Sequence, residues 1–306
     1  DRLRSRGLGD VYKRQIFAYA QGNQVDVSSY KDPWEYGGDT GLKDQKVTIK
    51  KIKGMSESSI RGMDISSYFA LKKAGVKYYD YEGNETPLLK VLHDNGINYI
   101  RIRIWNDPFN ADGETYGGGG NDVSTGVEIA KEAAKYDMKV LLDFHYSDFW
   151  AEPAVQLVPK AWKKDVNNTE KMCSDVYDFT KESIQKFKDA GANIGMVQVG
   201  NEITNGLLGI YSNRDKGESF NVIWGDKKKS TEVNKYLKAG IKAVRECTPQ
   251  ALVALHLETP NVWKYKTIMN TWKRDNVDYD VLGSSYYPFW SCLLYTSPSP
   301  RDRSLS

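Results

Sequence analysis

The sequence predicts an α/β fold, a (β/α)8 TIM barrel of which about six βα units are present. From residue 61 onward, short apolar runs alternate with longer stretches that have helical periodicity. Polar and aromatic residues also collect where the apolar runs end, which is where a (β/α)8 barrel builds its active site. A doubly wound sheet has the same alternation, but no glycine-rich phosphate loop follows the first run. These observations favour the barrel.

Six short runs rich in Val, Ile, Leu or Tyr are predicted to be strands that are buried on both faces. They cover residues 62–66, 99–105, 139–145, 195–201, 252–256 and 281–286. Their starts lie about 44 residues apart on average, which is room for one strand, one helix and their loops. Strands that are joined by helices in this way form a parallel sheet.

Four stretches between these runs have apolar residues at three- and four-residue steps and are predicted to be helices. The clearest is 169–190, in which Met172, Val176 and Phe187 share one face and Gly191 ends the helix. The other predicted helices are 86–95, 124–136 with Ser124 as its N-cap, and 230–247.

Composition and charge exclude several classes of protein. The 306 residues are 40% hydrophobic and 27% charged, and 43 Lys and Arg against 40 Asp and Glu give a net charge of +3. This charge is too small to favour a nucleic-acid partner, and no apolar run reaches the ~18 residues of a membrane span. Cys173, Cys247 and Cys292 include no CxxC pair, which excludes a zinc framework and a scaffold built on disulfides; a single Cys173–Cys247 disulfide stays open.

The two ends of the chain differ in composition from its body. Residues 1–15 are basic, and residues 292–306 are rich in Ser, Pro and Arg, so we interpret both as non-native tails, with native disordered tails as the alternative. Residues 18–20 (AYA) have the small-x-small pattern of a signal-peptidase site. We therefore interpret 16–60 as a signal-peptide remnant with an N-terminal extension and expect a secreted, periplasmic or cell-surface protein. The catalytic domain is expected at 61–291.

Each predicted strand ends in polar or aromatic side chains, and these ends would meet at one face of a barrel. Asn201 and Glu202 follow the fourth strand. A carboxylic acid there can protonate a glycosidic oxygen, and the amide beside it can hold a sugar hydroxyl; a glutamate that only starts a helix is the alternative. His145, Asp148 and Trp150, at the third strand, suit a sugar subsite better than a purely structural histidine. The other candidate binding residues are Asp64, Arg103, Trp105, His256, Tyr287 and Trp290.

Two arginines, Arg101 and Arg103, share one face of the second predicted strand. Buried arginines need carboxylate partners. Because Arg103 is nearer to the strand end, we expect it to pair with an active-site carboxylate, and we expect Arg101 to have a structural role lower in the barrel.

In five segments taken in order, the chain resembles glycoside hydrolase family 53, the arabinogalactan endo-β-1,4-galactanases. The segments are 62–66 (GMDIS), 101–105 (RIRIW), 142–148 (LDFHYSD), 197–203 (VQVGNEI) and 284–289 (SSYYPF). The resemblance covers residues 61 to about 291 and implies a (β/α)8 barrel of glycosidase clan A.

The resemblance also implies an activity, namely hydrolysis with retention of β-1,4-galactosidic bonds within the galactan or arabinogalactan of plant pectin side chains, without a cofactor. Glu202 matches the acid/base residue of the family, and we expect its pKa to be raised. Some bacterial relatives hold calcium in loops after the later strands, and we expect no such metal in this chain. The positions that line the substrate cleft are matched by His145, Asp148, Trp150, Asn201 and Tyr287.

The nucleophile of the family is a second glutamate at the end of the seventh strand. At about 44 residues per unit, that strand would begin past residue 320, so we expect a C-terminally truncated fragment that lacks the nucleophile. Glu258 follows the fifth strand and corresponds to a substrate position. We therefore expect the fragment to be inactive and, because its sheet edges are unpaired, to fold poorly.

Two other functions are weighed against this interpretation. The first is another endo-glycosidase of clan A, similar to mannanases or cellulases, and Asp64 with the segments at 145–148 and 285–287 argues against it. The second is a non-catalytic sugar-binding barrel, which would have lost a catalytic carboxylate, whereas Glu202 is present.

Overall fold

The computed structural model describes residues 53–287, which fall into two units. The described part of the smaller unit is 53–59 and 73–76, and the larger unit contains 60–72 and 77–287. In the smaller unit, the Ser59 hydroxyl accepts a hydrogen bond from the Ser56 amide. The predictions for the two tails, for most of 16–60, and for Trp290 and Cys292 lie outside the described residues.

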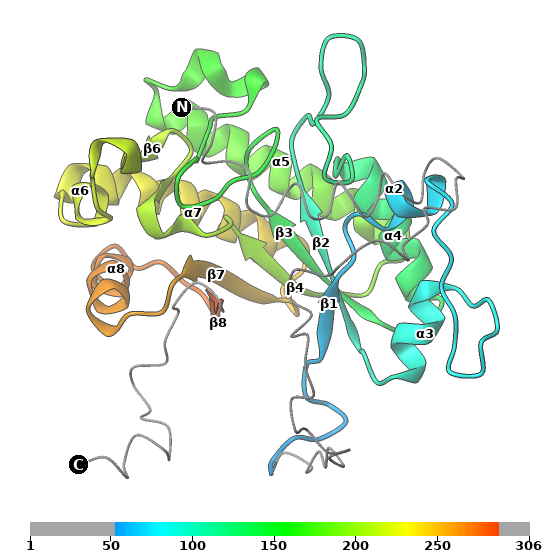
Figure 1. The fold of residues 1–306 in the computed structure, drawn as a ribbon. Helices are drawn as coiled ribbons and strands as arrows, with labels where there is room; N and C mark the ends of the chain where they lie inside the picture. The colour runs from blue at the N-terminus through cyan, green and yellow to red at the C-terminus, as the bar shows by residue number, and fades with distance from the viewer. Residues whose placement is uncertain (1–52, 288–306) are drawn as a thin grey trace, which may run out of the picture. The chain divides into compact units, whose positions relative to one another are not determined.

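Six parallel strands form the sheet of the larger unit, in the order β1-β2-β3-β4-β7-β8 (Figure 1). The sequence predicts six strands in one parallel sheet, and the structure confirms them, with small differences at their ends. The strands are β1 Gly62–Asp64, β2 Tyr99–Ile104, β3 Lys139–Phe144, β4 Ile194–Val199, β7 Leu252–Glu258 and β8 Val281–Ser285. Strands that follow one another in the sequence are neighbours in the sheet, as in a (β/α)8 barrel.

The two faces of this sheet carry different side chains. Ile100, Ile102 and Ile104 of β2 are completely buried in the main hydrophobic core, on the side of the helices. Because successive side chains of a strand alternate between faces, Arg101 and Arg103 project from the inner face. At the start of the strands, the inner face holds a small apolar cluster of Tyr99, Met196 and Ala254. Polar groups therefore occupy the inner face only toward the C-terminal ends of the strands.

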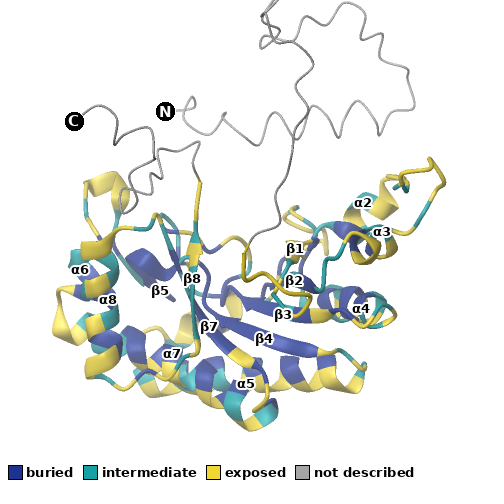
Figure 2. Ribbon diagram, turned by 90° about the horizontal axis from the view of Figure 1, so that it is seen from below, coloured by how far each residue is buried: buried dark blue, intermediate teal, exposed yellow. Residues whose placement is uncertain are grey.

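Helices cover the outer face of the sheet, and Figure 2 shows α4, α5 and α7 with buried residues toward the strands and exposed residues outward. α5 and α7 also pack against each other. The helices are α2 Tyr68–Lys73, α3 Leu88–Asp94, α4 Val123–Ala134, α5 Thr169–Asp189, α6 Asn221–Trp224, α7 Lys227–Cys247 and α8 Val262–Arg274. The sequence patterns identify α3, α4, α5 and α7, but they do not single out α8.

Capping residues explain two differences from the predicted helix starts. α4 begins one residue earlier than predicted, because Asp122 and not Ser124 is its N-cap and accepts a hydrogen bond from the Thr125 amide. α7 begins at Lys227, since the Asp226 carboxylate accepts from two amides of the first turn. Side-chain acceptors thus fix where these helices begin.

Between β4 and α7, a short hairpin interrupts the alternation of strands and helices. It consists of β5 Gly206–Leu207 and β6 Ile210–Tyr211, which pair antiparallel, and follows the 3-10 helix η3 Ile203–Asn205. Two further 3-10 helices are η2 Lys160–Asp165 and η4 Arg214–Lys216.

β1 and β8 are the edges of the sheet within residues 53–287. Each pairs with a single strand there, β1 with β2 and β8 with β7. All three residues of β1 are exposed. Cys173 and Cys247 are free thiols, so the open possibility of a disulfide between them is not realised. No helix in the described part of the chain is long and apolar enough to span a membrane.

Candidate active site

A pocket of about 470 Å³ lies at the C-terminal ends of the parallel strands. This is the edge of the sheet at which (β/α)8 barrels place their active sites. The predicted site residues that line it are Asp64, Arg103, Trp150, Asn201, Glu202, His256 and Tyr287. The lining also contains residues that the sequence did not suggest, namely Arg101, Ala151, Glu152, Gln198, Gly283, Ser284 and Ser285.

The backbone after β4 turns sharply to present Glu202 to the pocket. Gly200 has φ +84°, and a Cβ at this position would lie only 2.7 Å from Cγ2 of Ile203, so only glycine fits. Glu202 itself has φ +47° and ψ +48°, a left-handed conformation that costs about 1–2 kcal/mol for a residue with a side chain. Such strain is typical of functional positions that the surrounding structure holds in place.

The carboxyl group of Glu202 is partly buried in the pocket. Its Oε1 accepts a hydrogen bond from the Ser285 hydroxyl at 2.6 Å. Burial raises the pKa of Glu202, and the charges of Glu258 and Glu152 add to this effect, while the Ser285 hydrogen bond and Arg101 oppose it. The net effect is a raised pKa, which is the direction expected of a general acid.

Arg101 makes closer ion pairs with carboxylates of the site than Arg103 does, which corrects the purely structural role that was expected for Arg101. Arg101 contacts Oδ2 of Asp64 and Oδ2 of Asp143, each at 2.7 Å, and donates to Oδ1 of Asn201 at 2.9 Å. Arg103 comes no closer than 3.8 Å to Asp64 and instead stacks on Trp150, with Cζ 4.2 Å from the ring centroid. In the register of the sheet Asp143 lies opposite Arg103, so the Arg101 side chain extends along the strands toward their C-terminal ends to reach it.

Asp143 and Gln198 form the floor of the site, although the sequence did not mark them as site residues. Burial would raise the pKa of Asp143, but Arg101 and His145 outweigh this effect and hold the pKa below its usual range. Gln198 donates to Asp143 and, at 3.1 Å, to Oδ1 of Asn201. The sequence could have identified both residues, because the alternation of side chains along their strands places them on the inner face.

His145 is completely buried and does not line the pocket, which corrects its expected role in substrate binding. Its Nδ1 accepts from the Ala151 amide at 3.0 Å, so Nε2 carries the hydrogen that is donated to Oδ2 of Asp143 at 2.9 Å. His145 therefore ties the loop at Ala151 to the floor of the site.

Trp105 and Asp148 are likewise placed behind the pocket and not in its lining. Trp105 is completely buried, and its ring packs edge-on against that of Trp150, with centroids 5.6 Å apart. The Asp148 carboxylate accepts from the amides of Asp107 and Lys160 at 3.1 and 2.7 Å and so joins two loops. Both residues support the walls of the pocket, and Trp150, which is 41% exposed, supplies the accessible ring.

Both polar groups of the Asn201 side chain are already engaged. Oδ1 accepts from Arg101, and Nδ2 donates to the carbonyl of Ala151 at 2.8 Å. Asn201 thus orients the strand end that carries Glu202. Next to it, His256 lies with Nε2 2.8 Å from the Ser285 hydroxyl, and burial lowers the pKa of His256 to about 4. The imidazole is therefore neutral near pH 7.

Glu258, the alternative second carboxylate, does not line the pocket. Its carboxylate pairs with Nζ of Lys264 at 3.5 Å and accepts from the Thr259 hydroxyl. Its backbone amide donates to the Thr204 hydroxyl. These contacts are in keeping with the rejection of Glu258 as the nucleophile.

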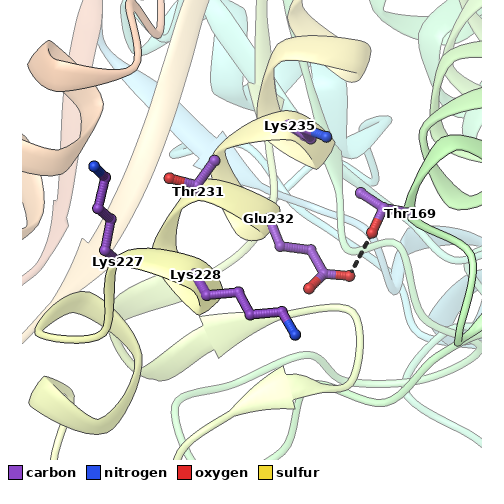
Figure 3. A pocket seen from close by; sticks show the side chains of 6 residues that line it. All are labelled: Thr169, Lys227, Lys228, Thr231, Glu232 and Lys235. Atoms are coloured by element: carbon purple, nitrogen blue, oxygen red, sulfur yellow. Dashed lines mark hydrogen bonds between the residues drawn. The ribbon is translucent and has the colours of Figure 1, made fainter.

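A second hollow, of about 490 Å³, lies beside the N-terminal ends of α5 and α7 (Figure 3). Its lining consists of Thr169, Lys227, Lys228, Thr231, Glu232 and Lys235. Glu232 accepts hydrogen bonds there from Thr169 and from Tyr236, and no aromatic ring lines the hollow. It therefore lacks the exposed ring that distinguishes the first pocket. Among residues 53–287, no group of three His, Cys, Asp or Glu side chains is arranged to hold a metal ion.

The parallel sheet with outer helices and a carboxyl of raised pKa at its C-terminal edge are features of a barrel-type glycoside hydrolase. A polar floor and an exposed indole beside this carboxyl fit the same class. The chain belongs to glycosyl hydrolase family 53, whose family model matches residues 60–298. The resemblance found in the sequence is thereby confirmed.

Individual relatives agree with this family. The chain is 43% identical to the endo-beta-1,4-galactanase of Bacillus subtilis (strain 168) over 81% of its own length and 54% of the relative. It is 31% identical to the arabinogalactan endo-beta-1,4-galactanase of Humicola insolens, over 76% of the chain and 64% of the relative. The chain thus spans between about half and two thirds of the length of these curated relatives.

Solved structures give the same result. The GH53 catalytic domain of Ignisphaera aggregans has a TM-score of 0.71 and 35% identity, with 80% of this chain and 64% of that domain covered. A fungal beta-1,4-galactanase structure has a TM-score of 0.63 and 29% identity, with 77% of this chain and 66% of that chain covered.

Proposed function

We propose that this chain is part of an endo-β-1,4-galactanase that hydrolyses β-1,4-galactosidic bonds in galactan or arabinogalactan with retention. The observation that carries the proposal is the partly buried Glu202, whose pKa is raised and which lies at the C-terminal edge of the sheet beside an exposed indole. The relatives named as galactanases support the choice of substrate.

In the proposed reaction, Glu202 is the general acid and then the general base. Burial raises its pKa and so favours the protonated form, which can donate a proton to the glycosidic oxygen as the bond breaks. Once ionised, it accepts a proton from the water that releases the sugar. Trp150 offers a flat apolar face on which a sugar ring stacks.

Retaining hydrolysis needs a second carboxylate about 5–5.5 Å from the acid. The other carboxylates that line the pocket are Asp64, which is held by Arg101 at 2.7 Å and by the Ser66 hydroxyl, and Glu152, which belongs to the loop after β3 and not to a strand end. We therefore propose that the nucleophile comes from a later strand of the barrel, outside residues 53–287, and that the 306-residue chain does not turn over galactan by itself.

The proposed site of action is outside the cytoplasm. The small-x-small pattern at 18–20 supports secretion, and a polymeric substrate has to be reached where it is deposited. Fractionation of a host that expresses the full-length gene tests this, with processing after residue 20 as the expected result. Retention of an unprocessed product in the cytoplasm would contradict secretion.

Calorimetric titration of the full-length protein with galactotetraose and mannotetraose tests the proposed substrate. We expect galactotetraose to bind more tightly and polymeric galactan to be cleaved internally. A preference for mannotetraose would support the alternative of a mannanase-like enzyme. Binding of galactotetraose without any hydrolysis by the full-length protein would instead support a non-catalytic sugar-binding barrel.

A further inference from the structure

A continuous line of hydrogen-bonding groups leads from Glu202 into the wall of the pocket. Oε1 of Glu202 lies 2.6 Å from the Ser285 hydroxyl, which lies 2.8 Å from Nε2 of His256. On the other side of the imidazole, Nδ1 lies 2.9 Å from Oδ1 of Asn201, 3.2 Å from Nε2 of Gln198 and 3.3 Å from the amide nitrogen of Glu202. Nδ1 therefore has both an acceptor and donors within reach.

When Glu202 is ionised, its carboxylate can only accept, so the single hydrogen of the Ser285 hydroxyl points to Oε1. The Ser285 oxygen then accepts from His256, whose hydrogen must be on Nε2. Nδ1 is left as an acceptor, and the Glu202 amide donates to it at 3.3 Å. Every group in the line is satisfied.

When Glu202 is protonated on Oε1, the hydrogen bonds from Glu202 through Ser285 and His256 to Asn201 run in the opposite direction, and the Glu202 amide gives up its hydrogen bond to Nδ1. Glu202 donates to the Ser285 oxygen, and the serine hydrogen turns to Nε2 of His256. A neutral imidazole then carries its hydrogen on Nδ1 and donates to Oδ1 of Asn201. The two states differ by one proton, taken from or returned to solvent water, and no bond between heavy atoms changes.

We propose that His256 changes tautomer as Glu202 gains or loses its proton, with Ser285 reversing the direction of its hydrogen bond between them. Ser285 and His256 are positioning residues in this scheme, since they act on substrate only through Glu202. The use of this relay in catalysis rests on the proposed function, because a retaining enzyme needs the same carboxyl first protonated and then ionised. The relay itself depends only on the hydrogen bonds.

The relay requires an imidazole that stays neutral, and the surroundings meet this condition. Burial lowers the pKa of His256 to about 4, so the imidazole does not become charged in the range in which a carboxyl of raised pKa titrates. Arg101 and His145 lower the pKa of His256 further, and Asp143 opposes them. The charged and titratable groups facing the line are Arg101 from β2, Asp143 and His145 at β3, Glu152 from the following loop and Glu258 from β7.

Nitrogen-15 NMR of the full-length protein labelled in its histidine rings measures the tautomer directly. This chain contributes three histidines, and a His256→Gln spectrum assigns the signals of His256. We expect Nε2 to be protonated at high pH and Nδ1 to be protonated at low pH. The midpoint of this change should equal the midpoint of the Glu202 carboxyl titration, which carbon-13 NMR measures. A tautomer that does not change through that titration would overturn the proposal.

Variants separate the relay from a structural effect. Ser285→Ala removes the hydroxyl and should abolish the change of tautomer, whereas Ser285→Thr retains a hydroxyl and should preserve it. Glu202→Gln removes the titrating group and should leave the tautomer unchanged through the pH range in which the parent carboxyl titrates. A change of tautomer that persists at the same midpoint in Ser285→Ala or in Glu202→Gln would refute the coupling.

A kinetic readout keeps the proposal testable if a variant gives poor spectra. The basic limb of the kcat/KM profile reports the ionisation of the general acid. Since the Ser285 hydrogen bond lowers the pKa of Glu202, Ser285→Ala should move this limb to higher pH, and Ser285→Thr should restore it. An unmoved limb in Ser285→Ala would contradict the proposal. The NMR measurement needs no galactan, so a failure of the substrate assignment would leave it intact.

Discussion

Replacing Arg101 by methionine is expected to destabilise the protein strongly. Arg101 neutralises Asp143, whose side chain is 0% exposed, at 2.7 Å and holds Asp64 at the same distance. Removal of one partner of a buried ion pair costs about 3–5 kcal/mol, because the other charge stays buried without compensation. Urea denaturation at pH 7 should therefore give a free energy of unfolding that is lower by about this amount.

The pH dependence of this loss gives a sharper test. In the parent protein the pKa of Asp143 is lowered, so its stabilising contribution is present above the unfolded value of ~3.9 and is lost as the pH falls through the folded pKa. Without Arg101, burial dominates and the pKa of Asp143 rises above the unfolded value. The destabilisation of Arg101→Met should therefore shrink between pH 7 and pH 5, because Asp143 can take up a proton.

Arg245→Met is the matched control, since Arg245 also contacts two carboxylates, Asp278 and Asp280, at 3.0 and 2.8 Å. Its side chain is 29% exposed and that of Asp278 is 73% exposed, so solvent screens the interaction. We expect this variant to lose about 0–1 kcal/mol. Equal losses for the two variants, or a loss in Arg101→Met that grows on acidification, would refute the assignment of Arg101 to the floor of the site.

Three further predictions concern the backbone, the sugar-binding ring and the sheet edges. Gly200→Ala should lower the free energy of unfolding by about 1–3 kcal/mol more than Gly191→Ala in thermal unfolding. Both glycines have positive φ, but only at position 200 would the added Cβ lie 2.7 Å from a neighbouring atom. Equal losses would contradict this. Trp150→Ala should weaken galactotetraose binding up to about tenfold in calorimetry. Trp263 is 60% exposed and lies outside the pocket, so Trp263→Ala should leave the affinity unchanged. An unchanged affinity in Trp150→Ala would exclude stacking. The 306-residue chain should elute as an aggregate in size-exclusion chromatography, because β1 and β8 have unpaired edges within residues 53–287. Two βα units appended from a relative should give a monomer. A monomeric, active 306-residue product would contradict this.

Much of the fold could be predicted because periodicity reports burial directly. A run such as 99–104, with isoleucine at every second position, shows which face of the strand packs against helices. The helix α8 was not singled out, because its buried residues are few and include Thr271. The hairpin β5–β6 has only two residues in each strand, which is too short for a periodic signal.

The candidate site could be predicted less completely, because contacts between strands decide the role of each side chain. Position at a strand end correctly brought Glu202, His256 and Tyr287 to one pocket. It could not show that His145 and Trp105 are covered by Ala151 and Trp150, since these belong to the following loop. The ion pair of Arg101 with Asp143 has the same origin. Asp143 lies on a neighbouring strand, opposite Arg103 in the register, and the sequence does not show which arginine side chain reaches it.

The role of Glu202 as acid/base residue is tested most directly by Glu202→Gln in the full-length protein, assayed on galactan and on an aryl β-galactoside with an activated leaving group. An amide cannot protonate the glycosidic oxygen, so kcat on galactan should fall by about 10²–10⁴-fold. Cleavage of the aryl glycosidic bond should fall much less, because this leaving group needs little protonation. Equal losses of bond cleavage on the two substrates would contradict the account.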